Sequence, residues 1–126
     1  MLMPKDRHLR IPFMLALAVI VAGLLVYRFA NVREERVAER FLEALKTQDY
    51  PRAYQIWGPS SSYTFKDFMT DWGGTNGYYG LVKGYKIMGS ESRGSGVIIT
   101  VEFDHLKNPV RLWVERRTHQ MSFSPY

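Results

Sequence analysis

The sequence contains no cysteine, and this absence excludes disulfide bonds, cysteine-ligated zinc and thiol nucleophiles. It also contains no Gly-Lys-Ser or Gly-Lys-Thr, the ending of the common phosphate-binding loop. Beyond residue 30 there is no run of basic residues interleaved with aromatic ones, the usual footprint of a nucleic-acid-binding protein. We therefore expect no nucleic-acid partner and no cofactor.

The positive charge of the chain is concentrated near its N-terminus. The net charge is +5, and residues 1–30 hold four basic residues against one acidic residue, a net of +3. The remaining 96 residues hold 13 basic and 11 acidic residues, a net of only +2. A segment of that length can bury a modest core on its own.

One long apolar run stands in the N-terminal region. Between Ile11 and Tyr27 no residue is ionisable, and these 17 positions span about 26 Å as a helix. Extension to Ala30 reaches the roughly 30 Å of a bilayer core. We therefore predict a basic tail at residues 1–10 and a transmembrane signal anchor at residues 11–30, with the lipid bilayer as its partner.

Two other interpretations of the apolar run compete with the transmembrane anchor. A buried core helix would need more chain around it than the sequence provides. A cleaved signal peptide has a similar basic start, but this run is longer than usual and "VYRFANVRE" has no small-x-small cleavage site. Basic residues flank the run on both sides, so their count does not fix the orientation. Because the basic start resembles a secretory signal, we predict a cytoplasmic N-terminus and an extracytoplasmic domain at the cell (inner) membrane.

After residue 30 the apolar residues recur at helical spacing. Val37, Phe41 and Leu45 share one helical face, and charged residues, Glu34 among them, occupy the other faces. The "TQDYP" stretch predicts a turn, and Pro51 suits the first turn of a second short helix. This segment is therefore predicted to form two helices.

The glycine-rich stretch "YTFKDFMTDWGGTNGYYG" predicts the end of a third helix. Thr64 and Asp67 have the spacing of a capping box, and the aromatic residues after Thr64 recur every three or four positions. Gly73 stands where a left-handed residue ends many helices. A phosphate loop would instead precede a helix, so no phosphate site is expected here.

From Tyr79 onward the periodicity changes to two. Alternating apolar residues such as Val97 and Val101 predict half-buried strands, with "SESRGSG" as a hairpin turn. Arg116 and Arg117 are interpreted as part of a solvated strand edge. Four successive strands after a set of helices predict an α+β fold with an antiparallel meander.

The segment "RFLEALKTQDYPRAYQIW" resembles the opening of the nuclear transport factor 2-like superfamily. The residues that carry the resemblance are Phe41, Leu42, Ala44, Leu45, Asp49, Ala53 and Tyr54. As an order of elements it extends from Val32 to Tyr126, which assigns residues 31–126 to such a domain. The resemblance implies two or three short helices packed on a curved four-stranded antiparallel sheet. The resulting cone could hold a small apolar molecule or a partner's side chain, and no active site is carried over.

Aromatic residues are the candidates for lining such a cone. The predicted ligand pocket consists of Trp57, Tyr63, Phe68, Trp72, Tyr79 and Trp113. Their helical or strand spacing is also typical of an ordinary core, which is the main alternative. We therefore expect a single-pass membrane-anchored domain that binds a partner protein or a small apolar ligand.

Enzymes of this superfamily use carboxylate, histidine or tyrosine side chains inside the cone, with a pKa shifted by burial. The candidates of these types are Asp71, Glu102, Asp104, His105, His119, Tyr63, Tyr78 and Tyr79. The histidines fall in expected turns or in the tail and lack the spacing of metal ligands, so we assign neither a metal site nor a catalytic residue. An isomerase, dehydratase or hydrolase with a buried carboxylate remains the alternative function. A helical-repeat adaptor would need more than the one helix pair present.

Overall fold

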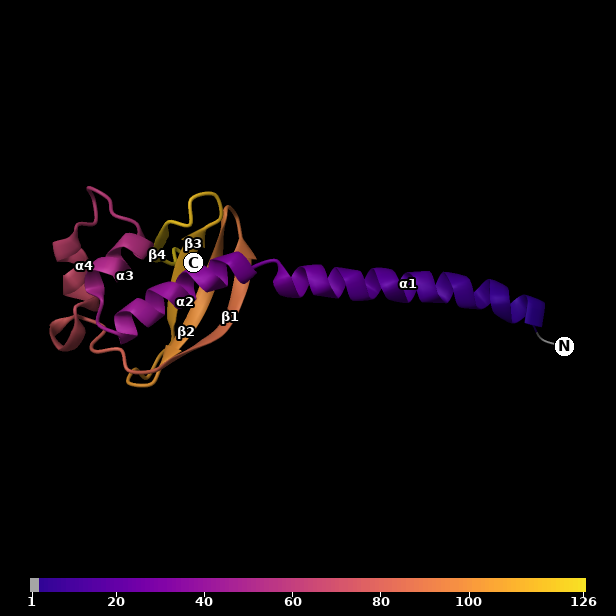
Figure 1. Ribbon diagram of the computed structural model, residues 1–126, viewed down its shortest axis with the longest axis horizontal. Coiled ribbons are helices and arrows are strands. Elements are labelled where there is room, and N and C mark those ends of the chain that lie inside the picture. The colour runs from indigo at the N-terminus through magenta and orange to yellow at the C-terminus, as the bar shows by residue number, and fades with distance from the viewer. Residues whose placement is uncertain (1–2) are drawn as a thin grey trace. The chain divides into compact units, whose positions relative to one another are not determined.

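The chain divides into two compact units in this computed structural model, which describes residues 3–126, with side chains from residue 10 onward. One unit ends at Ala30 and the other comprises Asn31–Tyr126. The first unit holds the single helix α1 (Met3–Phe29), whereas the second holds three α-helices and four strands (Figure 1). The side chains of the predicted basic tail lie outside the described residues, except for that of residue 10.

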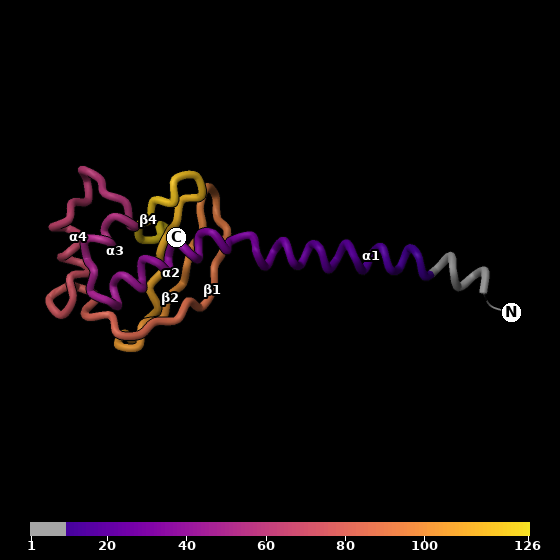
Figure 2. The backbone as a smooth tube through the Cα atoms, in the orientation of Figure 1, coloured from indigo at the N-terminus to yellow at the C-terminus, as the bar shows by residue number. Residues whose placement is uncertain are grey.

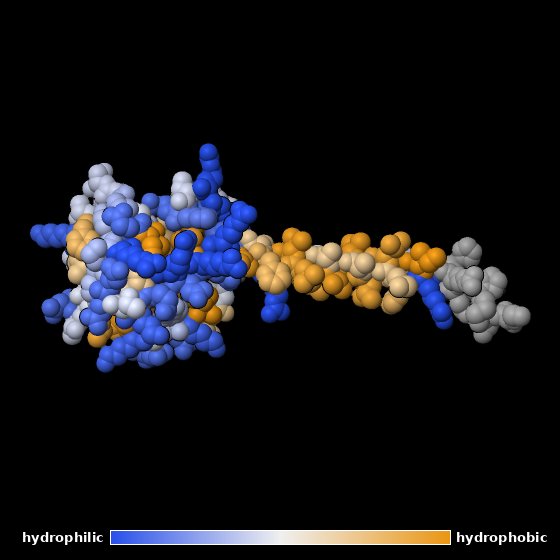
Figure 3. Space-filling model, viewed as in Figure 1, coloured by the Kyte–Doolittle hydropathy of each residue, from blue (hydrophilic) through white to orange (hydrophobic). Residues whose placement is uncertain are grey.

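Helix α1 is apolar over most of its length, and its described side chains, from residue 10 onward, are all exposed. From Arg10 to Phe29 every residue is exposed, and Val19 and Val26 expose 71% and 70% of their surface. Figure 3 shows this apolar surface, and it shows that the visible face of the second unit is mostly hydrophilic. By length and composition, this is the one stretch of the described chain that could cross a membrane, and a signal sequence would meet the same criteria.

The second unit is built on a sheet in which each strand pairs with the next. The strands are β1 (Tyr85–Arg93), β2 (Gly96–Phe103), β3 (Val110–Glu115) and β4 (Met121–Phe123). All three pairings are antiparallel, as the meander prediction requires. The alternation predicted from Tyr79 is wrong at its start, because Tyr79 stacks on Trp72 and the first strand begins only at Tyr85.

A bulge in β1 adds to the curvature of the sheet, which Figure 2 shows in outline. The pairing register with β2 shifts between Ile87 and Gly89, so Met88 has no residue opposite it and is 51% exposed. A bulge of this kind bends its strand and increases the local twist. The sheet can therefore curve around the helices packed on one face.

Helix α2 (Val32–Lys46) presents an apolar face to the sheet. Phe41 and Leu42 are fully buried, as the periodicity predicts. Figure 1 shows the helix lying across the sheet, where it contacts β1, β2 and β3. Gln48, with a positive φ of 60°, makes the turn that follows. The first amphipathic segment is therefore a helix that covers the core.

Two shorter helices, α3 (Tyr50–Trp57) and α4 (Phe65–Trp72), follow α2. The predicted capping box at the start of α4 is present: the Thr64 hydroxyl accepts the Asp67 N–H at 3.3 Å, and the Asp67 carboxylate accepts the Thr64 N–H at 3.1 Å. These bonds satisfy donors that the first turn of a helix leaves unpaired. The third predicted helix is therefore confirmed at its start.

The glycines end α4 as predicted, but the left-handed residue is not the predicted one. Gly73 has a φ of −75°, and Gly74 has a φ of 72°. A Cβ at Gly74 would also lie 2.8 Å from the Tyr50 hydroxyl oxygen. The prediction for Gly73 is therefore wrong by one residue, because the left-handed position is Gly74. The contact of Gly74 with Tyr50 is a tertiary one, which the local sequence does not reveal.

The core lies between the three helices and one face of the sheet. Its strand residues include Val97, Ile99, Val101 and Phe103 from β2, and Leu112 and Val114 from β3. Ile98 and Trp113 are also buried, but they lie outside this core and on the alternate face of their strands. The predicted α+β fold, with short helices packed on a four-stranded antiparallel sheet, is confirmed.

Candidate functional site

Five of the six predicted pocket residues come together in one aromatic cluster. Trp57, Phe68 and Trp72 are almost completely buried, whereas Tyr63 and Tyr79 are half-buried. The ring centroids of Trp57 and Tyr63 are 5.8 Å apart, and those of Trp72 and Tyr79 are 4.5 Å apart. Such spacings are typical of aromatic packing. The rings fill space against one another, and only the half-buried ones reach the surface.

Phe41 and Phe123 complete this cluster, although neither was among the predicted pocket residues. The Phe41 ring lies 5.1 Å from Trp57 and 5.3 Å from Trp72, in the middle of the group. Phe123, on the short strand β4, lies 5.1 Å from the Trp57 ring. The helical spacing of Phe41 marked it as core, but the partners of β4 cannot be predicted from three residues.

Trp113, the sixth predicted residue, lies apart from the cluster. Its ring packs 5.7 Å from that of Tyr126, and its indole N–H donates to a Glu115 carboxylate oxygen at 3.0 Å. A Cβ at Gly96, which pairs with Glu115, would approach the Trp113 ring to 2.3 Å, so only glycine fits at this position of β2. Trp113 therefore covers the other face of the sheet.

Two surface grooves meet at Phe123. The first, here called the β4 groove, has a volume of about 490 Å³ and is lined by Trp57, Ser60, Ser62, Tyr63, Gln120 and neighbouring β4 residues. The second, of about 550 Å³, is bordered by Tyr79 and Leu106. The Gln120 amide donates to the carbonyl oxygens of Trp57 and Gly58, at 2.8 Å each, and fixes one side of the β4 groove.

A tyrosine–carboxylate pair stands beside the β4 groove. The Tyr63 hydroxyl donates to Asp71 at 2.5 Å, and both residues are half-buried. Burial, followed by the Asp71 carboxylate, raises the pKa of Tyr63 far above its ordinary value. Burial and the same carboxylate raise the pKa of Tyr79. Tyr63 is therefore a neutral hydrogen-bond donor, with its hydroxyl oriented by Asp71.

The other acid–base candidates are not assembled around this pair. Glu102 and Asp104 are exposed, and Tyr78 exposes 79% of its surface. The exposed His105 ring lies 2.6 Å from the Tyr79 carbonyl oxygen, through Nε2. His119 sits in the turn before β4 with a φ of 58°. Of the predicted candidates, only Asp71 and Tyr63 form a half-buried pair of the kind that an acid–base site requires.

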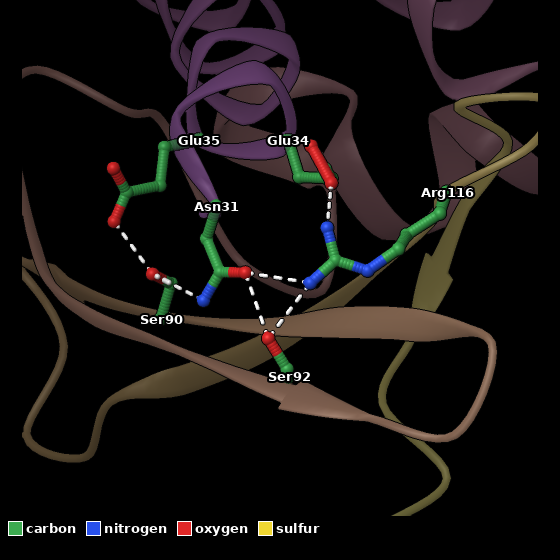
Figure 4. Close-up of polar contacts among 6 residues, drawn as sticks. All are labelled: Asn31, Glu34, Glu35, Ser90, Ser92 and Arg116. Atoms are coloured by element: carbon green, nitrogen blue, oxygen red, sulfur yellow. Dashed lines mark hydrogen bonds and ion pairs between the residues drawn. The ribbon is translucent and has the colours of Figure 1, made fainter. Parts of the chain in front are cut away.

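A polar cluster with two buried members, Asn31 and Glu34, holds the start of α2 (Figure 4), and the sequence did not predict it. Its members come from the first turn of α2, from β1 and from the end of β3: Asn31, Glu34, Glu35, Ser90, Ser92 and Arg116. Glu34 was expected on a solvated helix face and Arg116 on a solvated strand edge. Both expectations are wrong, because Glu34 is only 4% exposed and the two side chains form an ion pair.

The bonds of this cluster run in one connected chain. Arg116 donates to Glu34, to the Asn31 amide oxygen at 2.7 Å and to the Ser92 hydroxyl at 2.7 Å. Ser92 in turn donates to Asn31 at 2.8 Å. The second carboxylate oxygen of Glu34 is buried without a hydrogen-bond partner among the described residues. The ion pair with Arg116 therefore compensates for the burial of the Glu34 carboxylate, since an unpaired buried carboxylate is strongly destabilising.

One sequence signal could have revealed Glu34. It precedes Val37, Phe41 and Leu45 by 3, 7 and 11 positions, so it lies on the same helical stripe as the buried apolar residues. A charge on that stripe must be buried with a partner. The partner itself lies 82 residues away and could not be read from the pattern.

The described side chains, from residue 10 to the end, contain no group of three or more His, Asp or Glu residues placed to hold a metal ion. The groups available for chemistry in the second unit include the aromatic cluster with its two grooves, the Tyr63–Asp71 pair and the polar cluster. No protein-family model matches the sequence, and no curated protein and no solved structure is significantly similar to it.

Proposed function

We propose that the chain is a single-pass membrane protein in which residues 11–30 are an uncleaved signal anchor for a ligand-binding domain. The observation that carries this proposal is that α1 is apolar yet exposes every residue from Arg10 to Phe29. Exposure of such an apolar surface to water is unfavourable, whereas its insertion into the hydrocarbon core of a membrane is favourable. The adjoining unit has a core of its own, so α1 is not needed to complete it.

The start of the second unit supports retention of the anchor. Asn31 is only 9% exposed and is bonded to Arg116 and Ser92, directly after the apolar segment. Proteases cut exposed, unstructured backbone most readily, and Asn31 is neither exposed nor without hydrogen-bond partners. A cleavage site immediately before α2 would therefore be poorly accessible once the domain has folded.

Membrane fractionation tests the anchor. The chain, carrying a C-terminal affinity tag, should sediment with membranes and remain there after extraction at alkaline pH. The intact mass of the purified protein should include residues 11–30. Recovery of a shortened chain from the aqueous fraction would overturn the proposal.

We place the N-terminus in the cytoplasm and the domain outside. The second unit of 96 residues exceeds the loop length, about 60 residues, over which basic residues set the orientation. The orientation is then set by the basic residues of the short N-terminal segment. Because the chain lacks cysteine, a single Lys83→Cys substitution gives a clean label site. A membrane-impermeant maleimide should label it in intact cells with a permeabilised outer barrier, and protection from the reagent would reverse the orientation.

The resemblance to the nuclear transport factor 2-like superfamily is part of the proposal. It is supported by the order of elements, with α2, α3 and α4 preceding a four-stranded antiparallel meander. It is also supported by the burial of the residues that carry it, such as Phe41, Leu42 and Ala53. The curved sheet and the helices on one face are the arrangement that the superfamily implies.

The β4 groove is the proposed binding site for a small apolar ligand or a partner's side chain. Its volume of about 490 Å³ is within the usual range for small-molecule sites. Aromatic side chains, Trp57 and Tyr63, supply an apolar wall, and Ser60 and Ser62 supply hydroxyls at the rim. A ligand with an apolar body and one hydrogen-bonding end fits this combination.

A steric block tests the β4 groove. Ser62→Trp should fill the groove, whereas Ser61→Trp, at an exposed residue that does not line it, is the matched control. Native mass spectrometry of the detergent-extracted protein should show a small bound molecule in the parent chain and the control, and not in Ser62→Trp. A photo-crosslinking residue at position 62 distinguishes a protein partner from a small ligand. A protein partner would add the mass of a second polypeptide to the crosslinked product. Equal occupancy of both tryptophan variants would contradict the proposal.

A second candidate function is favoured by the Tyr63–Asp71 pair. An isomerase, dehydratase or hydrolase could use Asp71 as its base, held in position by the hydrogen bond from the Tyr63 hydroxyl. Hydrolysis of a neutral p-nitrophenyl ester is a simple probe of such chemistry. Turnover lost in both Tyr63→Phe and Asp71→Asn, with the fold intact, would establish the enzyme. Turnover that survives in both variants would exclude this pair from catalysis.

A further inference from the structure

The outer face of α2 forms a third and larger groove, distinct from the β4 groove. It has a volume of about 670 Å³ and lies over α2, the start of α3 and the turn before β4. Its charged lining residues are Arg33, Arg36, Arg40 and Arg52, with Glu39 and Glu43. We call it the basic groove.

The arginines of the basic groove have no carboxylate partners. Within the described residues, none of the four forms an ion pair, although arginines elsewhere do have partners. Arg116 pairs with Glu34, and Arg111 donates to the Tyr126 carbonyl oxygen at 3.0 Å. One of the two carboxylates in the groove, Glu43, accepts the Tyr85 hydroxyl at 2.5 Å. The groove therefore carries an excess of positive charge with free donors.

The placement of these arginines disfavours the helix that bears them. Arg33, Arg36 and Arg40 follow one another at three and four residues, so like charges lie side by side on one stripe. Arg33 also stands in the first turn of α2, where the helix dipole disfavours a positive charge. The glutamates three residues after Arg36 and Arg40 offset part of the repulsion along the stripe, and a bound anion would offset the remainder.

One lining residue of the basic groove, Arg33, lies close in the sequence to the end of the apolar segment. Arg33 is three residues after Ala30, the end of the apolar segment, so its Cα lies at most about 11 Å from that of Ala30. If Ala30 marks the hydrocarbon edge, this reach falls at the level of the lipid headgroups or just beyond them. Guanidinium groups bind phosphate oxygens through paired N–H bonds, which a lipid phosphate accepts.

We propose that the basic groove binds the phosphate groups of acidic phospholipids on the side of the membrane where the domain lies. This inference rests on the proposed anchor, and it adds a second, electrostatic contact with the same membrane. Basic residues next to a membrane span strengthen attachment to anionic lipids in this way. The basic groove and the β4 groove share no lining residue, so the β4 groove would remain available to its ligand.

The test uses the full chain in a neutral detergent, where binding does not depend on how α1 inserts. Calorimetric titration with short-chain phosphatidylglycerol is compared with phosphatidylcholine and with inorganic phosphate. The groove variant is Arg36→Ala with Arg40→Ala. The matched control is Lys83→Ala with Lys86→Ala, which removes the same charge from exposed residues outside the groove. Thermal unfolding checks that both variants fold.

We expect phosphatidylglycerol to bind more tightly than phosphatidylcholine and the affinity to fall as salt rises. The groove variant should bind roughly 30-fold more weakly, about fivefold for each arginine removed, and the control should change little. Equal binding of the two lipids, or equal losses in the two variants, would overturn the proposal. Inorganic phosphate bound as tightly as phosphatidylglycerol would assign the groove to a soluble anion instead of a lipid. Because alkaline extraction tests the anchor separately, the proposal of an anchor and the proposal of lipid binding can be overturned independently.

Discussion

Helix α2 is held within the second unit by one kind of force at its start and by another farther along. Its first turn is held by the polar cluster, in which Glu34 and Asn31 bond to Arg116. Farther along, Phe41 is held by aromatic rings, with Trp57 and Trp72 at about 5 Å. The same helix therefore combines a directional attachment with a non-directional one.

The two attachments should respond differently to substitution. Apolar packing loses stability in proportion to the volume removed, whichever partner is shortened. A buried ion pair is asymmetric, because removal of one partner leaves the other charged and unpaired. Removal of both charges can be nearly neutral. The aromatic end thus supplies stability, and the polar end fixes where α2 begins against β1 and β3.

The largest expected effect is at the aromatic end. Phe41→Ala should lower the free energy of unfolding by about 3–5 kcal/mol, because it leaves a cavity among rings that cannot close over it. Denaturant unfolding followed by tryptophan fluorescence measures the loss. Phe65→Ala, at a residue that is 41% exposed, is the control and should cost much less. Similar losses in the two variants would show that the aromatic cluster is not the main source of stability.

The polar end should give the next largest effect. Arg116→Ala should cost roughly 3 kcal/mol, since it leaves the Glu34 carboxylate buried without its cation. Arg117→Ala, one residue away and exposed, should change stability by less than about 0.5 kcal/mol. The double variant Arg116→Met with Glu34→Leu should recover most of the loss. A double variant less stable than Arg116→Ala would contradict the asymmetry of the polar end.

A smaller effect is expected where the aromatic cluster carries a polar group. Tyr63→Phe removes the hydrogen bond to Asp71 and should cost about 1 kcal/mol near neutral pH. Burial and Asp71 raise the pKa of Tyr63, so its stabilising effect is complete below pH 10. Above pH 10 the unfolded chain loses this proton first, and the advantage of the parent chain over Tyr63→Phe should shrink.

Unfolding at pH 8 and pH 11 measures this change as a difference between the two chains, so the other tyrosines largely cancel. Tyr78→Phe, at a residue that is 79% exposed, is the control and should show no comparable trend. A constant difference between the parent chain and Tyr63→Phe across this pH range would indicate that Tyr63 ionises normally in the folded state.

The smallest effect is expected at a surface ion pair that serves as a reference for Arg116. Arg93 and Glu91 are 4.0 Å apart, and their side chains are 50% and 60% exposed. Glu91→Ala should therefore change the free energy of unfolding by less than about 0.5 kcal/mol, because water screens both charges. Thermal unfolding in low and high salt is sufficient to check it. A loss comparable with that of Arg116→Ala would mean that burial is not what separates the two ion pairs.

Much of the fold was predictable because its signals are local. The apolar stripe with Phe41 predicted α2, and the spacing of Thr64 and Asp67 predicted the start of α4. Strand alternation predicted β2, with Val97 and Val101 on the core face. In each case a few neighbouring residues determine the hydrogen bonds or the face.

The candidate sites were less predictable because their parts come from distant segments. The sequence suggested the aromatic residues, and strand alternation put Trp113 on the face opposite Leu112 and Val114, but nothing in it showed that Phe123 joins the cluster. It offered Asp71 and Tyr63 among eight acid–base candidates without showing that these two are paired. It treated Glu34 and Arg116 as solvated.

The sequence alone determined that one segment is apolar on all sides, that amphipathic helices follow it and that alternating strands follow those. Hydrophobic periodicity and helix capping act over a few residues, so they can be recognised without knowledge of the fold. Only the tertiary structure decided that Arg116 meets Glu34 across 82 positions, that Tyr63 meets Asp71 beside a groove, and that four arginines line another groove. Those contacts depend on strand register and on the packing of helices against the sheet, which no short stretch of sequence specifies.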